Sequence, residues 1–134
     1  MVILGYCGDR CDVCPRYIAS QNKRIDELKK VAILWKKAGF RNNLDSPNNL
    51  VCEGCNKEKE CAYDNVKECC ISKNIENCGN CREYPCNLIN KVFEKTRDIE
   101  LKCSKNLNID DFKTLKIAFF QKKEYLDNEN NKKF

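Results

Sequence analysis

The sequence predicts a mainly α, small single domain of about three helices with irregular, cysteine-rich, metal-binding loops of the zinc-knuckle kind. Its 134 residues suit one domain. Twelve residues are cysteine and none is histidine, a cysteine content typical of short chains whose cysteines form the scaffold. Apolar residues recur at helical spacing, and no long alternating stretch favours a strand.

The cysteines are expected to be reduced. The start, MVILGYCGDRCD, lacks the charged and apolar regions of a secretory signal peptide. No stretch approaches the roughly 18 apolar residues of a membrane span. We therefore expect a cytoplasmic protein without a membrane segment, in which clustered thiols bind metal rather than form disulfides.

Residues 1–40 are predicted to contain a first cysteine cluster followed by one amphipathic helix. Pro15 suits the first turn of this helix and Gly39 suits its end. Trp35 is expected to pack in the core. The apolar face comprises Ile25, Leu28, Val31, Ala32, Trp35 and Ala38.

Residues 41–51 are rich in Asn, Asp, Ser and Pro and are predicted to form a linker. Residues 52–86 hold eight of the twelve cysteines and few large apolar residues. Metal rather than a hydrophobic core is therefore expected to order this second segment, which should unfold when the metal is removed.

Residues 87–127 are predicted to form the C-terminal helices. One helix begins near Pro85 and reaches Cys103, with Leu88, Ile89, Val92, Phe93 and Thr96 on one side. Another opens at Asn108 or Asp110, with Phe112, Leu115, Phe119 and Leu126 at helical spacing and with Lys122 and Lys123 late in the helix, where the dipole favours cations. Residues 128–134 are expected to be a frayed tail.

Three CxxC pairs, CDVC, CEGC and CGNC, indicate metal binding, because two thiolates at this spacing chelate one ion through a tight turn. Gly54 and Gly79 suit turns that need a positive φ. We expect two or three zinc ions. The candidate ligands are Cys7, Cys11, Cys14, Cys52, Cys55, Cys61, Cys69, Cys78, Cys81 and Cys86.

The spacing leaves open which cysteines share an ion. Cys52 and Cys55 with Cys78 and Cys81 would make one pair of knuckles. Cys14 and Cys86 lie at predicted helix starts, where the dipole lowers a thiol pKa. A buried, non-ligating role best suits Cys103 and remains open for Cys70.

An iron–sulfur cluster is the alternative cofactor, because thiolates suit both metals. Cys7, Cys11 and Cys14 have the CxxxCxxC spacing of radical S-adenosylmethionine enzymes. The chain is too short and too helical for the barrel that carries this motif in those enzymes.

Net charge and composition disfavour nucleic-acid binding and several enzyme classes. The formal charge of +5 counts thiols as neutral, whereas two four-thiolate zinc sites would lower it to +1 and three to −1. Lysine also far outnumbers arginine, the better residue for base and phosphate recognition. The absence of histidine removes the commonest general base. Asp26, Glu27, Asp110 and Asp111 are expected to be solvated or to cap helices.

These observations favour a protein in which zinc is structural and the helices present a surface to an unknown protein partner. The alternative is a thiol-dependent redox, metal-handling or iron–sulfur protein. A closed four-thiolate site would favour the first reading, because catalytic zinc keeps an open position.

The order YCGDRCDVCPRYIA, CEGC, a middle cysteine segment and IENCGNCREYPC resembles the uncharacterised prokaryotic family catalogued as domain of unknown function 3795. The resemblance implies a small cysteine-rich cytoplasmic protein, thought to bind zinc, with no established activity. Asp64 stands where the family pattern has a cysteine. Either its carboxylate completes that site, or Cys70 substitutes, or the site is lost.

Overall fold

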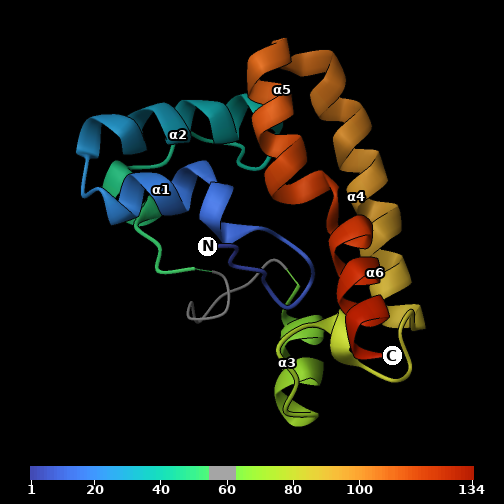
Figure 1. The fold of residues 1–134 in the computed structure, drawn as a ribbon. Coiled ribbons are helices and arrows are strands. Elements are labelled where there is room, and N and C mark those ends of the chain that lie inside the picture. The colour runs from blue at the N-terminus through green and yellow to red at the C-terminus, as the bar shows by residue number, and fades with distance from the viewer. Residues whose placement is uncertain (55–62) are drawn as a thin grey trace.

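The computed structural model describes residues 1–54 and 63–134, and these residues form a mainly helical single domain (Figure 1). An isolated bridge between Leu4 and Arg10 is the one β-type pairing in the described ranges. The short turns are η1 (Cys11–Val13), η2 (Pro47–Leu50), η3 (Cys78–Asn80) and the π-helical turn η4 (Lys116–Phe120). The α-helices are α1 (Pro15–Gln21), α2 (Ile25–Ala38), α3 (Asp64–Ser72), α4 (Asn87–Asn106), α5 (Ile109–Leu115) and α6 (Lys122–Lys133).

The single helix expected after the first cysteine cluster is divided into α1 and α2. Pro15 occupies the first turn of α1, as predicted, and Gly39 ends α2 with a φ of 83°. Between the helices Lys23 has a φ of 54°, which a continuing helix does not allow. The break leaves Ile25 exposed at the start of α2, whereas the other predicted apolar positions are buried.

Residues 41–50 do not form a helix continuing α2, but part of this segment packs closely against the fold. It ends in the short turn η2, which contacts α2. Leu50 is buried there, and its carbonyl accepts a hydrogen bond from Arg16 Nε at 2.7 Å. The end of this segment is therefore fixed to α1, next to Cys52.

The helix predicted near Pro85 is α4, and it buries Ile89, Val92, Phe93 and Thr96 as expected. Cys86 is its N-cap residue. Cys103 lies in its last turns and is fully buried, where its thiol donates to the Ala38 carbonyl at 3.5 Å. This thiol joins α4 to the end of α2.

The last predicted helix is interrupted by η4, which separates α5 from α6. Asn108 caps α5 by accepting a hydrogen bond from Asp111 N at 2.8 Å, in agreement with the predicted start. The prediction for Lys122 was wrong, because this residue begins α6 and is only 4% exposed. It therefore lies at the positive end of a helix dipole, not at the negative end.

Residues 128–134, expected to be a frayed tail, continue α6 as far as Lys133. In Figure 1 this helix runs beside α4 and ends near the turn of residues 78–80. Asn130 Nδ2 donates to the Gly79 carbonyl at 3.0 Å. This contact joins the end of α6 to the CGNC turn, since Asn130 has a partner outside its own helix.

Two hydrophobic clusters divide the interior. The first surrounds Trp35, whose ring meets Phe40 and Phe119 edge-on at centroid distances of 5.4 and 5.9 Å, which confirms its predicted core position. The second cluster joins α3, α4 and α6 to the N-terminal segment through Cys7, Cys70, Cys78, Val66, Ile89, Val92, Phe93 and Leu126. Cys7, Cys70 and Cys78 therefore pack inside the second hydrophobic cluster, and the cysteines are not confined to surface loops.

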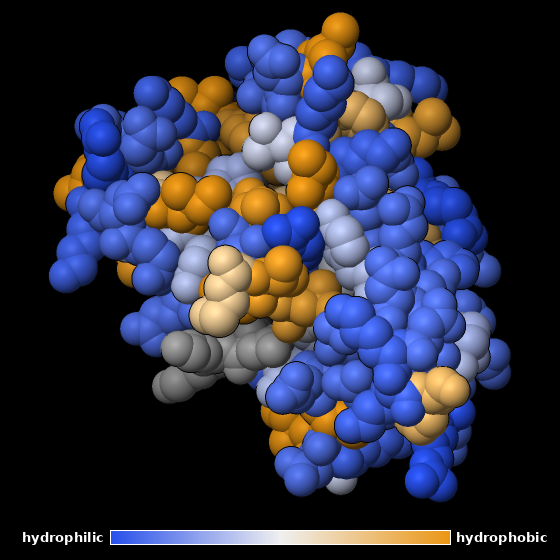
Figure 2. Space-filling model, viewed as in Figure 1, coloured by the Kyte–Doolittle hydropathy of each residue, from blue (hydrophilic) through white to orange (hydrophobic). Residues whose placement is uncertain are grey.

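None of the described helices combines the length and apolarity needed to cross a membrane. Figure 2 shows a hydrophilic face over α6, whereas apolar side chains gather over the α1 and α2 side. Exposed residues of that side include Ile18 and Ile33.

Candidate metal centre

Cys11, Cys14 and Cys52, which we call the first cysteine group, come together from η1, the start of α1 and the segment after η2. All three are buried. The lower pKa expected for Cys14 at a helix start is wrong, because burial raises it to about 12. The charges of Cys52 and Cys11 add to this rise, whereas the nearby backbone N–H groups of Tyr17 and Arg16 oppose it. A cation bound among these thiols would instead lower the Cys14 pKa, because positive charge stabilises the thiolate.

Hydrogen bonds to α1 hold Cys52 in this group. Cys52 N donates to Ser20 Oγ at 2.9 Å, one turn along α1 from the Arg16 contact with Leu50. Gly54 N then donates to Cys52 Sγ at 3.2 Å. Gly54 has the predicted positive φ, at 108°. An N–H directed at a cysteine sulfur stabilises negative charge on it, as a metal-bound thiolate requires.

Cys7, Cys69, Cys70, Cys78, Cys81 and Cys86, which we call the second cysteine group, lie near α3 and η3. Cys70 is fully buried, and its Sγ lies 3.7 Å from Cys78 Sγ. This hydrogen bond lowers the pKa of Cys70 and raises that of Cys78, and the charges of Cys86 and Cys7 raise the latter further. The proximity of these sulfurs therefore disfavours several negative charges unless a cation accompanies them.

The CGNC turn of the second group is clamped between the N-terminal segment and α6. Cys78 N donates to the Tyr6 carbonyl at 3.0 Å, and the buried Asn77 side chain accepts from Gly79 N at 2.9 Å. A Cβ on Gly79 would lie 2.6 Å from the Leu126 carbonyl. Gly79 is thus required for a close approach to α6, not for the positive φ that the sequence suggested.

The two outer thiols of this group, Cys69 and Cys81, are half-buried and lie near Lys73. Lys73 Nζ is 3.2 Å from Cys81 Sγ and 3.1 Å from Glu83 Oε2, and both contacts raise the Lys73 pKa. Glu83 N also directs its hydrogen at Cys81 Sγ, at 3.4 Å. Positive charge and an N–H donor therefore both face this sulfur.

Tertiary structure groups the cysteines differently from the pairing suggested by spacing. Cys52 lies with Cys14 and Cys11, whereas Cys78 lies with Cys70, Cys86 and Cys7. Cys7 and Cys14 belong to one cysteine cluster in the sequence, but they pack in different hydrophobic clusters of the structure. The predicted ligands Cys55 and Cys61 lie outside the described residues. No disulfide bond joins any two of the described cysteines.

The sequence left open whether Cys70 is a metal ligand, and the position of Cys70 in the structure is more informative than its spacing. It is buried against Cys78, whereas Asp64 is exposed at the start of α3. Cys103 has the buried, isolated position expected of it, in the Trp35 cluster. Within residues 1–54 and 63–134, no three Cys, Asp or Glu side chains converge closely enough to bind one ion as they stand.

A buried ion pair borders the second group and had no clear signal in the sequence. Lys122 Nζ lies 2.6 Å from Asp9 Oδ1 and 5.7 Å from the centre of the Tyr63 ring. Burial lowers the pKa of Lys122, but the charge of Asp9, followed by that of Cys7, raises it above its ordinary value overall. Gly8 makes this contact possible, because a Cβ there would lie 2.9 Å from the Lys122 backbone.

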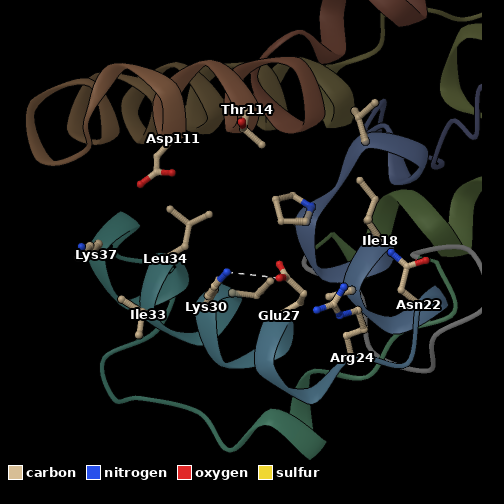
Figure 3. Close-up of a pocket in the computed structure, with 14 residues that line it drawn as sticks. Ile18, Asn22, Arg24, Glu27, Lys30, Ile33, Leu34, Lys37, Asp111 and Thr114 are labelled. Carbon is tan, nitrogen blue, oxygen red and sulfur yellow. Dashed lines mark hydrogen bonds and ion pairs between the residues drawn. The ribbon is translucent and has the colours of Figure 1, made fainter.

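A groove of about 500 Å³ lies between α1, α2 and α5 (Figure 3). Leu34 and Ile18 contribute apolar surface, and Asp111 and Thr114 project from α5. Glu27 is paired with Lys30 at 3.3 Å across one turn of α2. The groove therefore has apolar walls with charged edges, and no described cysteine lines it.

Comparison with family models finds a match over residues 3–91, to the family described as "Protein of unknown function (DUF3795)". The match covers both cysteine groups and the start of α4, whereas α5 and α6 lie beyond it. Neither the curated proteins nor the solved structures contain a significant match.

Proposed function

We propose that this chain, which belongs to the DUF3795 family, is a zinc protein in which the metal is structural. The family description assigns no activity, so the proposal is argued from the cysteines. The distance of 3.7 Å between Cys70 Sγ and Cys78 Sγ carries this proposal. Tetrahedral zinc with Zn–S bonds of about 2.3 Å separates its sulfurs by about 3.8 Å. The chemistry and spacing of this buried pair therefore fit two zinc ligands.

The first cysteine group fits a second, separate site. Cys11 with Cys14 supplies one CxxC pair, and Cys52 begins another that Cys55, outside the described residues, would complete. Four thiolates make a closed tetrahedral site. Zinc would fix the segment after η2 against the start of α1, in addition to the Ser20 and Arg16 hydrogen bonds.

The proposed role is an interaction or adaptor domain with a protein partner. Closed thiolate sites leave zinc no position for substrate. The carboxylates considered as catalytic candidates have structural explanations: Asp26 pairs with Arg24 at 3.2 Å, Glu27 pairs with Lys30, and Asp110 and Asp111 lie in the first turn of α5. Nucleic acid is a poor partner, because each four-thiolate site would reduce the positive charge by two.

Elemental analysis of protein purified without oxygen and without added metal tests the proposal. We expect two or three equivalents of zinc per chain and no visible absorption. Iron with acid-labile sulfide would instead identify an iron–sulfur protein. A fully folded protein without any bound metal would refute metal binding as the basis of the fold.

Substitution of knuckle cysteines assigns the metal to this chain's thiols. We expect Cys78→Ser and Cys81→Ser to lower the zinc content and the thermal midpoint, because structural zinc contributes roughly 10 to 16 kcal/mol in small fingers. Cys103→Ser is the matched control, since its thiol lies in the Trp35 cluster. Full zinc content in both knuckle variants would contradict the assignment.

A thiol-dependent redox function is the second candidate, and the contact of Lys73 Nζ with Cys81 Sγ favours it. A neighbouring ammonium group stabilises a thiolate and increases its reactivity. Mass spectrometry after brief alkylation of metal-loaded protein distinguishes the two functions. A ligated Cys81 is protected until zinc is removed, whereas a redox-active Cys81 is modified in the loaded protein.

A further inference from the structure

The groove between α1, α2 and α5 is a surface feature that zinc binding does not explain. It has a volume of about 500 Å³, and no described cysteine lines it. Figure 3 shows Leu34 of α2 directed toward α5, with Asp111 and Thr114 opposite and Ile18 on the α1 side. Ile18 is 43% exposed. Apolar side chains of another molecule can therefore enter the groove and contact Leu34 and Ile18.

Basic residues dominate the segment that forms one wall of this groove. Residues 23–45, which contain α2, hold seven basic and three acidic residues, so they carry a net charge of +4 out of the chain's formal +5. This segment contains no cysteine, so zinc binding leaves its charge unchanged. All seven basic residues are exposed: Lys23, Arg24, Lys29, Lys30, Lys36, Lys37 and Arg41.

The acidic residues of this segment are already paired within it. Each lies 3.2 to 3.3 Å from a basic partner: Asp26 from Arg24, Glu27 from Lys30 and Asp45 from Arg41. In the part of the chain that the structure describes, four lysines of the segment have no ion pair: Lys23, Lys29, Lys36 and Lys37. Since unpaired lysines attract carboxylates and repel other cations, charge complementarity favours an acidic partner.

Helix geometry places lysines along the α2 side of the groove. Successive residues of a helix are about 100° apart, so Lys30 and Lys37 point in nearly the same direction, on either side of Leu34 in the sequence. Both lysines line the groove. Lys29 and Lys36 form a second row, farther around α2. A molecule bound in the groove therefore meets positive charge along its α2 side.

The α5 edge of the groove is acidic instead. Asp111 lines it from the first turn of α5, and its Oδ2 accepts a hydrogen bond from Asn108 Nδ2 at 3.1 Å. Glu27, the other acidic residue that lines the groove, is paired with Lys30. A bound segment must therefore direct its carboxylates toward α2 and away from α5.

We propose that this groove binds an acidic amphipathic helix of a partner protein. Its apolar face lies against Leu34 and Ile18, and its Asp or Glu residues lie beside Lys30 and Lys37. Helices bind in grooves through apolar residues spaced three and four apart. The 14 residues of α2 extend about 21 Å, which is about four turns of a partner helix. The proposal rests on the interaction role proposed above and specifies the chemistry of the partner.

A pair of synthetic peptides tests the docking, because charge can be reversed without changing the apolar face. The first is a helix of about 18 residues, with leucine on one face and glutamate on the other, and the second has lysine in place of each glutamate. NMR titration of the full, zinc-loaded chain measures binding. We expect the glutamate peptide to shift the resonances of Ile18, Leu34 and Thr114 saturably and to bind more weakly at higher salt. The lysine peptide is expected not to bind.

Equal binding of the two peptides, binding of neither, or shifts confined to residues outside the groove would overturn the proposal. Binding to vesicles of anionic phospholipid without binding of the glutamate peptide would also overturn it, since the basic surface would then be a membrane contact. Zinc analysis of the same samples separates the two proposals. Full zinc content without peptide binding refutes the docking alone, whereas peptide binding by folded, zinc-free protein refutes structural zinc alone.

Two variants with matched controls locate the binding. Ile18→Asp and Lys37→Glu are each expected to weaken binding of the glutamate peptide about tenfold or more, because one removes an apolar contact and the other an attractive charge. Ile71→Asp and Lys102→Glu are the controls, since these exposed residues of α3 and α4 lie outside the groove. The thermal midpoint reports on the folding of each variant. Wild-type affinity in both groove variants would overturn the proposal.

Discussion

Gly79 illustrates, at the scale of one residue, how a small side chain positions a candidate ligand pair. It lies between Cys78 and Cys81 and directly under α6, where a Cβ would meet the Leu126 carbonyl at 2.6 Å and Glu129 Cβ at 2.9 Å. Backbone atoms cannot move aside as the end of a flexible side chain can. The CGNC turn and α6 therefore constrain each other.

We predict that Gly79→Ala lowers the free energy of unfolding by about 1 to 3 kcal/mol, the usual cost of overpacking. Urea denaturation measures this change, and hydrogen exchange should increase at Leu126 to Asn130. Gly39→Ala is the control, because its cost comes from a φ of 83° with no atom within 4 Å of the added Cβ. Unchanged protection of α6 in Gly79→Ala would contradict the predicted clash.

The pair of Lys122 and Asp9 gives the second residue-scale prediction. Removing one partner of a buried ion pair leaves the other charge unpaired, at a cost of about 3 to 5 kcal/mol. We therefore expect Lys122→Met to be strongly destabilising and Asp9→Asn to recover part of the loss in the double variant. Chemical denaturation of the four proteins measures the coupling, and strictly additive effects would show that the pair makes no joint contribution.

At the scale of elements, the sequence predicted helices better than their interruptions. The apolar positions from Leu28 to Ala38 identified α2, because burial of one face produces its periodicity. The break at Lys23 had no glycine or proline to announce it. The π-helical turn η4 was hidden for another reason, since Phe119 and Leu126 keep helical spacing across it.

The grouping of the cysteines was beyond prediction from spacing, because it depends on contacts between distant segments. The hydrogen bond from Cys52 N to Ser20 Oγ holds Cys52 near Cys14. The hydrogen bond from Cys78 N to the Tyr6 carbonyl holds Cys78 near Cys7. CxxC spacing shows which thiols are local partners. It contains no information on which two pairs meet.

The final helix gives a prediction at this scale, since the sequence did not indicate its contact with the CGNC turn. Deletion of residues 128–134 removes Asn130, whose amide donates to the Gly79 carbonyl at 3.0 Å. We expect lower stability and faster hydrogen exchange in residues 78–81, with each lost hydrogen bond contributing about 0.5 to 1.5 kcal/mol. Deletion of the exposed residues 132–134 alone should have little effect. Equal behaviour of the two deletions would refute an anchoring role for α6.

At the scale of the whole molecule, the two cysteine groups adjoin different hydrophobic clusters of one helical framework. The first lies where η1, the start of α1 and the segment after η2 meet, and the second lies near α3 and the contact of η3 with α6. The Trp35 cluster lies beside the first group and includes Cys14. Metal in either group would therefore reinforce packing that hydrogen bonds and apolar contacts already define.

Metal binding should also change the charge of the entire chain. The formal charge is +5 with neutral thiols, at a sequence pI of about 8.6. Each four-thiolate zinc site carries −2, so two such sites lower the charge from +5 to +1. We expect zinc-loaded protein to focus below pH 8.6 in native, oxygen-free isoelectric focusing, and chelator-treated protein to focus nearer that value. Cys103→Ser should retain the shift, whereas identical focusing of loaded and stripped wild-type protein would show that the thiols do not hold zinc as thiolates.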